Sequence, residues 1–112
     1  MPIIVDRDTI VGDLAFEIAR LETLLADLER VGNGTLPTPE QLARAPLLDP
    51  FGFGTRELPC LVGGNHGHPV LRGPMIRTTE LWMFAPRLGW ARTLSRFYRL
   101  GRIAMPDDGS NE

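Results

Sequence analysis

The sequence predicts an α+β fold in which a long N-terminal helix and a short second helix pack on a small, mostly antiparallel sheet of three or four strands. Apolar residues recur at helical spacing near the N-terminus, the pattern becomes extended after Pro59, and turn residues separate the extended segments. The 112 residues suit a single domain. We place this domain at residues 1–102 and expect residues 103–112 to form a flexible, acidic, polar tail.

We expect the first helix to span residues 8–31, because its apolar side chains are spaced alternately three and four residues apart. These side chains are Val11, Leu14, Ile18, Leu21, Leu25 and Leu28. Asp8 or Thr9 would cap the start of this helix, and the glycines of the segment Gly32-Asn33-Gly34 would end it.

The same spacing is that of a coiled-coil heptad, so a homodimer through residues 10–31 is the alternative to packing within one domain. In a parallel pair, Glu17 would lie opposite Glu22 of the second copy, and the two carboxylates would repel each other. Leu24 and Val31 also widen the apolar stripe, as in a helix that covers its own core. Packing within the domain is therefore the first expectation.

A second, short helix is predicted where Thr38, Pro39 and Gln41 stand in the order of a capping box with proline at the first helical position. Pro46 limits this helix to about residue 44 or 45. The following residues, up to Pro59, contain several prolines and glycines and predict a loop.

Strands are expected at residues 60–62, 76–84 and 90–100, where β-branched and aromatic residues are frequent, and residues 3–5 would add an edge strand. Pro86 and Gly89 predict a hairpin turn between the two longer segments.

The expected register of this hairpin places Phe84 opposite Trp90, Trp82 opposite Arg92, and Glu80 opposite Leu94. A helix over residues 90–101 is the alternative, because its apolar residues also fit helical spacing.

Charge is sorted along the chain. Residues 1–50 carry nine acidic and four basic side chains, whereas residues 51–102 carry eight arginines and only two glutamates. The chain contains no lysine, and arginine suits fixed contacts with carboxylates, phosphates and aromatic rings better than lysine does. The arginines of the second half either pair with the acidic half of the same fold or face an acidic partner.

The second possibility predicts a non-enzymatic interaction module whose Arg/aromatic hairpin binds an acidic macromolecule, either nucleic acid or a complex that handles nucleic acid. Guanidinium groups would contact phosphates while aromatic rings stack on bases. The candidate binding residues are Arg77, Trp82, Arg92, Arg96, Tyr98 and Arg99.

The sequence predicts no catalytic residue, metal site or cofactor. Cys60, His66 and His68 lie close together, but zinc needs three or four ligands and no second Cys/His pair exists. Cys60 also lacks a predicted oxyanion site, so we interpret it as a small apolar residue. The single cysteine, the absence of a secretory signal and the absence of a membrane-spanning apolar segment favour the cytoplasm.

Three motifs resemble a family of short bacterial proteins of unknown function. They are the Gly67-His68-Pro69 turn, the segment IRTTEL at 76–81, and the segment WARTLSRFYRLG at 90–101. The resemblance covers residues 36–101, and the first helix more loosely. It implies a small α+β unit, often encoded near mobile or phage-derived genes, and no known activity.

That genomic setting implies an alternative function, namely inhibition of a bacterial defence complex by protein–protein contact, as anti-CRISPR proteins do. The acidic helix would then imitate phosphates toward a basic groove. Its candidate residues are Asp13, Glu17, Asp27 and Glu29.

Overall fold

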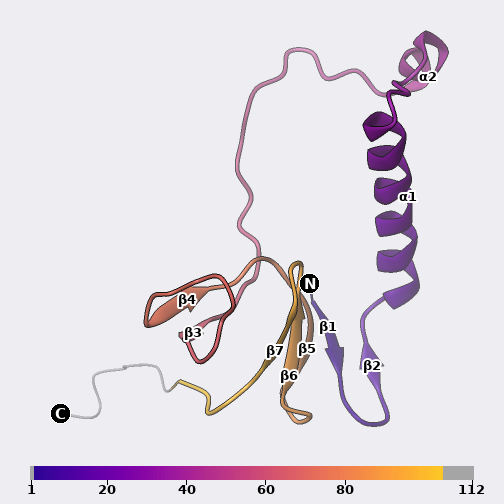
Figure 1. The fold of residues 1–112 in the computed structure, drawn as a ribbon. Helices are drawn as coiled ribbons and strands as arrows, with labels where there is room; N and C mark the ends of the chain where they lie inside the picture. Colours follow the sequence, from indigo (N-terminus) through magenta and orange to yellow (C-terminus); the bar gives the residue numbers. More distant parts are fainter. Residues whose placement is uncertain (1, 105–112) are drawn as a thin grey trace. The chain divides into compact units, whose positions relative to one another are not determined.

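A computed structural model describes residues 2–104 of the chain, and the elements are labelled in Figure 1. The described residues form two compact units, one made of residues 2–12 and 57–104 and the other of residues 13–56. Two helices lie in the second unit, and the strands of a five-stranded and a two-stranded sheet lie in the first. The α+β class is confirmed. The described residues contain more strands than expected, because short turns divide the two long extended segments and because residues 10–11, expected in the first helix, form a strand.

The five-stranded sheet has the order β2-β1-β5-β6-β7. Its strands are β1 (Ile3–Val5), β2 (Ile10–Val11), β5 (Leu81–Ala85), β6 (Trp90–Thr93) and β7 (Phe97–Arg99). Strands β1 and β5 pair in parallel, and the other neighbours pair antiparallel, so the sheet is mostly antiparallel as expected. The predicted strand at residues 3–5 is confirmed, although it pairs on both sides rather than lying at an edge.

The β5–β6 hairpin is confirmed, but its expected register is wrong near the turn. Trp90 pairs with Ala85 rather than Phe84, and Arg92 pairs with Met83 rather than Trp82. A four-residue turn causes the difference, because the backbone N–H of Gly89 donates to the Ala85 carbonyl at 2.9 Å. A bulge between Leu81 and Met83 then restores the expected alignment, and the Leu94 N–H donates to the Glu80 carbonyl at 2.8 Å.

The expected strand at residues 90–100 is instead two strands joined by a tight turn, and the helical alternative is excluded. Thr93 fixes this turn. Its N–H donates to the Arg96 carbonyl at 2.9 Å, and its hydroxyl oxygen accepts hydrogen bonds from the N–H groups of Ser95 and Arg96. The Thr93 side chain is buried, with 1% of its surface exposed, so these local bonds are what satisfy its hydroxyl.

Strands β3 (Val62–Gly64) and β4 (Met75–Arg77) form the two-stranded antiparallel sheet. The expected strand at residues 60–62 therefore begins two residues later. The preceding residues still run beside the segment before β5, because Leu81 N–H donates to the Pro59 carbonyl at 2.8 Å. The segment expected as one strand at 76–84 ends at Arg77 and resumes at Leu81, since the Thr78 hydroxyl accepts from the Leu61 N–H instead of facing a ladder partner.

The loop between β3 and β4 is held by the side chains of Asn65 and His68. The Asn65 amide donates to the carbonyls of Leu71 and Gly73 at 2.8 Å each, and its oxygen accepts from the His68 N–H at 3.1 Å. The His68 ring Nδ1 accepts from the N–H groups of Val70 and Leu71. This histidine therefore serves as a local hydrogen-bond acceptor that orders the loop.

Helix α1 (Leu14–Gly32) begins six residues later than expected. Asp13 is its N-cap and accepts from the Phe16 N–H at 2.9 Å, whereas Asp8 lies in the turn between β1 and β2. Gly12 separates the strand from the helix: its φ is +125°, and a Cβ there would approach Ile3 Cδ1 to 2.5 Å. Val11 consequently belongs to β2 and not to the apolar stripe of the helix.

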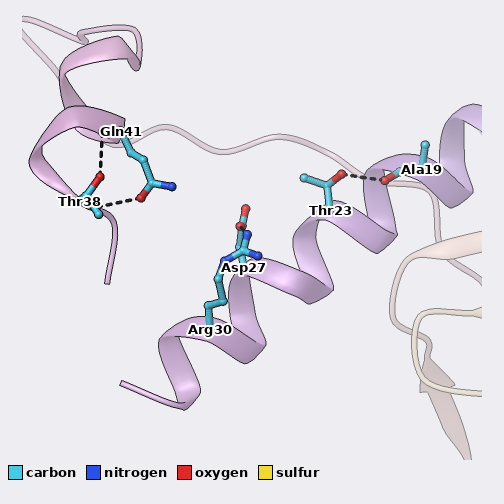
Figure 2. A network of polar contacts seen from close by, with 6 residues as sticks. All are labelled: Ala19, Thr23, Asp27, Arg30, Thr38 and Gln41. Atoms are coloured by element: carbon cyan, nitrogen blue, oxygen red, sulfur yellow. Dashed lines mark hydrogen bonds and ion pairs between the residues drawn. The ribbon is translucent and has the colours of Figure 1, made fainter. Parts of the chain in front are cut away.

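The end of α1 is a Schellman motif. Gly34 has a φ of +87° and donates its N–H to the Val31 carbonyl at 3.0 Å, while the Thr35 N–H donates to the Arg30 carbonyl at 2.8 Å. The left-handed residue is thus Gly34, and Gly32 is the last helical residue. Figure 2 shows two polar contacts along this helix: the hydrogen bond that the Thr23 hydroxyl donates to the Ala19 carbonyl, and the Asp27–Arg30 ion pair.

Helix α2 (Pro39–Arg44) has the predicted bounds and the predicted capping box. Gln41 N–H donates to the Thr38 hydroxyl at 3.1 Å, and Thr38 N–H donates to the Gln41 side-chain oxygen at 2.8 Å, as Figure 2 shows. Ala45 has extended backbone angles before Pro46, which is why the helix ends there.

The buried side chains of the described residues all belong to the five-stranded sheet: Ile3, Leu81, Ala85, Ala91 and Thr93. No residue of α1 or α2 is buried, and Leu21, Leu25 and Leu28 are all exposed. The packing of the helices on the sheet and the homodimer through residues 10–31 both stay predictions. Neither described helix has the length and hydropathy needed to cross a bilayer.

Candidate binding face on strands β6 and β7

The register of the C-terminal strands brings two arginines and two aromatic residues to one face of the sheet. Trp90 pairs with Arg99, and Arg92 pairs with Phe97. Paired residues, and residues two apart on one strand, point to the same side of a sheet. Trp90, Arg92, Phe97 and Arg99 therefore form one patch, which we call the β6–β7 face, in which cationic and aromatic side chains alternate in both directions.

Two contacts fix the centre of this face. The guanidinium carbon of Arg92 lies 5.2 Å from the centre of the Phe97 ring, within cation–π range. The Trp90 and Phe97 rings meet edge to face, with 5.5 Å between their centres and 73° between their planes. Phe97 nevertheless keeps 60% of its surface exposed, so the face presents an accessible ring.

The arginines of this face are not neutralised within their own unit. The described part of that unit, residues 2–12 and 57–104, contains eight arginines and the four carboxylates Asp6, Asp8, Glu57 and Glu80. Its one ion pair joins Arg87 to Asp6 at 3.4 Å, and neither Arg92 nor Arg99 contacts a carboxylate of that part. The face therefore carries uncompensated positive charge beside exposed aromatic surface.

Two further arginines of the predicted site lie elsewhere. Arg77 is exposed on β4 and lines an open hollow of about 480 Å³, together with Glu57, Cys60 and Glu80. Arg96 belongs to the β6–β7 turn and is half-buried, and its Nε is buried without a hydrogen-bond partner among the described residues. Arg96 is therefore partly committed to the fold, and its replacement is a poor test of binding.

The two aromatic residues of the predicted site do not join Arg92. Trp82 lies at the bulge of β5 and is half-buried. Tyr98 pairs with Ala91 and so points to the opposite side of the sheet, where its ring lies 6.1 Å from the His68 ring. Tyr98 thus helps to hold the β3–β4 loop on the sheet.

Trp90 and Phe97 take the places that the sequence interpretation gave to Trp82 and Tyr98. Trp82 is displaced because the one-residue shift beside the β5–β6 turn pairs Arg92 with Met83, and Tyr98 is displaced because a turn after Thr93 divides the expected strand and pairs Arg92 with Phe97. A signal was present: Ala91 is small and apolar and fits a covered position between Trp90 and Arg92, which leaves these two residues as neighbours on the other face.

The acidic residues of the alternative interface lie in the helical unit, and three of the four have local partners. Asp13 caps α1, Glu17 pairs with Arg20 at 2.8 Å, and Asp27 pairs with Arg30. Glu29 is exposed. Exposed pairs of this kind are weak, so they reduce the acidic character of the helix without abolishing it, and the inhibitor hypothesis stays a prediction.

Within residues 2–104, no three Cys, His, Asp or Glu side chains gather in a way that would hold a metal ion. Cys60 is a free, half-buried thiol, and His68 Nδ1 is engaged by backbone N–H groups.

Comparison with protein families matches residues 18–108 to DUF6634, a family of unknown function. The match includes most of α1, all of α2, and strands β3 to β7. No curated protein and no solved structure matches the chain.

Proposed function

The chain belongs to the DUF6634 family, which carries no assigned function, and from its own geometry we propose that it is a non-enzymatic module that binds nucleic acid through the β6–β7 face. The observation that carries the proposal is the pairing of uncompensated guanidinium groups with an exposed ring. Arg92 and Arg99 supply charge for phosphates, and Phe97 supplies apolar surface for bases.

The distribution of charge favours nucleic acid as the partner over a protein of undefined chemistry. Four net positive charges belong to the described part of the sheet unit, whereas the helical unit, residues 13–56, is net negative. A polyanion would therefore be attracted to the sheet unit and repelled by the helical unit. The exposed hydroxyls of Ser95, in the β6–β7 turn, and Thr79, in the segment before β5, hydrogen-bond to each other at 2.9 Å, so one of the two is left to donate to a phosphate.

The test is binding of labelled DNA and RNA oligonucleotides, followed by fluorescence anisotropy at several salt concentrations between about 50 and 200 mM. We expect affinity to fall steeply with salt. The Arg92→Ala/Arg99→Ala variant should bind more weakly, and the slope of log K against log salt should become shallower by about one unit per lost phosphate contact.

The matched control is Arg20→Ala/Arg30→Ala, which removes the same charge from α1. Both of these arginines contact helical carboxylates, so their loss should leave the salt slope near that of the unmodified protein. Equal slopes for the two double variants would contradict the proposal. If the protein bound no oligonucleotide but retained an acidic protein complex, its partner would be a protein and not nucleic acid.

A further inference from the structure

The β6–β7 face also indicates which form of nucleic acid it takes. We infer that the ligand is single-stranded, with an unpaired base stacked on Phe97 and its flanking phosphates on Arg92 and Arg99. This inference rests on the proposed function and specifies its substrate class.

The first argument is the accessibility of the ring. Phe97 lies on β7, the last strand of the five-stranded sheet, and 60% of its surface is exposed. A base that stacks on it must leave its own helix, because the faces of paired bases in a duplex are covered by the neighbouring base pairs. A duplex offers phosphates and groove edges instead, and reading the major groove requires a protruding helix or ribbon. An exposed ring on the surface of a sheet fits unpaired bases.

The second argument is that the ring is already oriented. Two neighbours hold Phe97: the Arg92 guanidinium carbon lies 5.2 Å from the centre of its ring, and the Trp90 ring centre lies 5.5 Å from it. Side chains that are fixed before binding lose less conformational entropy when the ligand arrives. Stacking on Phe97 therefore yields a larger net gain than stacking on a freely rotating side chain.

The third argument is the alternation of residue types. Each ring has one arginine opposite it on the neighbouring strand, at a separation of about 5 Å. A second arginine lies two positions away on the same strand as the ring, at about 6.7 Å. A single strand that crosses the face can therefore place a base on a ring and a phosphate on the neighbouring guanidinium. The rigid phosphate spacing of a duplex offers no such alternation of base faces and phosphates.

The experiment compares one labelled oligonucleotide as a single strand and as a duplex, with the full chain and its Phe97→Ala variant. We expect the unmodified protein to bind the single strand at least about tenfold more tightly. Phe97→Ala should weaken single-strand binding by about five- to 100-fold, the range for loss of one base–aromatic stack. The salt slope should stay unchanged, since no charge is removed.

Phe16→Ala is the matched control, because Phe16 is a similarly exposed phenylalanine on α1, with 58% of its surface accessible. Its replacement should leave binding unchanged. Phe97→Tyr and Phe97→Leu complete the series: the tyrosine variant should retain affinity, and the leucine variant, which keeps apolar bulk without a π face, should lose it. Leucine also preserves the test if the alanine variant fails to fold.

The outcomes separate the two proposals. Equal affinity for single strand and duplex, with full affinity in Phe97→Ala, overturns stacking while the salt dependence of Arg92→Ala/Arg99→Ala still supports nucleic-acid binding. Absence of binding to every oligonucleotide overturns both.

Discussion

The guanidinium group of Arg92 lies over the ring of Phe97, across the β6–β7 strand pair, with 5.2 Å between the guanidinium carbon and the ring centre. The contact joins a charge and an aromatic surface in one fixed arrangement. It also explains why arginine suits this position, because a planar guanidinium stacks on a ring whereas an ammonium group remains a hydrated point charge.

Arg92→Lys should therefore separate charge from stacking. The lysine keeps the positive charge, so we expect the salt slope of oligonucleotide binding to stay near that of the unmodified protein. Loss of the planar contact should weaken the orientation of Phe97, by about 0.5–1 kcal/mol for an exposed cation–π pair, and lower single-strand affinity severalfold. Anisotropy titrations measure both quantities. An affinity equal to that of the unmodified protein would show that only the charge at residue 92 matters.

Thr93 should be the most sensitive polar position of the sheet. Thr93→Val keeps the side-chain shape but removes the hydroxyl that accepts from the N–H groups of Ser95 and Arg96. Loss of a buried acceptor leaves these donors with poorer partners, which costs about 1–3 kcal/mol of unfolding free energy. Urea denaturation followed by circular dichroism measures this cost.

Thr93→Ser is the control for that measurement. It keeps the hydroxyl and removes one methyl group, so it should cost about 1 kcal/mol. A serine variant that is less stable than the valine variant would mean that apolar packing, and not the hydroxyl, makes Thr93 important.

The helices show which features of this fold are local enough to be predicted from sequence. The capping box of Thr38 and Gln41 and the end of α2 before Pro46 depend on neighbouring residues alone, and both are confirmed. The start of α1 was misplaced because Val11 extends the apolar heptad by one position, whereas Gly12 ends that continuity through its backbone conformation. Periodicity does not reveal a backbone angle.

The sheet shows what sequence reasoning could not determine. Pairing of Ile3 with Met83 brings residues 80 positions apart into one parallel ladder, and no local pattern specifies that contact. The bulge at Trp82 depends on the same tertiary setting, whereas the β6–β7 pairing decides that Trp90 and Phe97 accompany Arg92. The residue types of the candidate site could therefore be predicted from the sequence, but not which residues share one face of the sheet.

The β3–β4 loop should depend on the half-buried Asn65 for its order. Asn65→Ala removes three hydrogen bonds, two of them to the carbonyls of Leu71 and Gly73. We expect a loss of about 1–2 kcal/mol, since exposed bonds contribute near the lower end of their range. Thermal unfolding and amide hydrogen exchange of residues 65–74 measure the effect. His66→Ala is the control, because the exposed His66 ring is not part of this hydrogen-bonded set, and an equal loss in both variants would contradict the assignment.

The two glycines at the end of α1 should respond in opposite directions to the same substitution. Gly34 has a φ of +87°, which alanine adopts only with strain, so Gly34→Ala should destabilise the helix end by about 1 kcal/mol. Gly32 is the last helical residue, has no positive φ, and has no atom within 4 Å of an added Cβ. Gly32→Ala should therefore stabilise α1 by up to about 1 kcal/mol, because alanine is the better helix former and restricts the unfolded chain. Helical circular dichroism against temperature compares the two variants directly. A destabilising Gly32→Ala together with a neutral Gly34→Ala would mean that residue 32, and not residue 34, is the left-handed end of the helix.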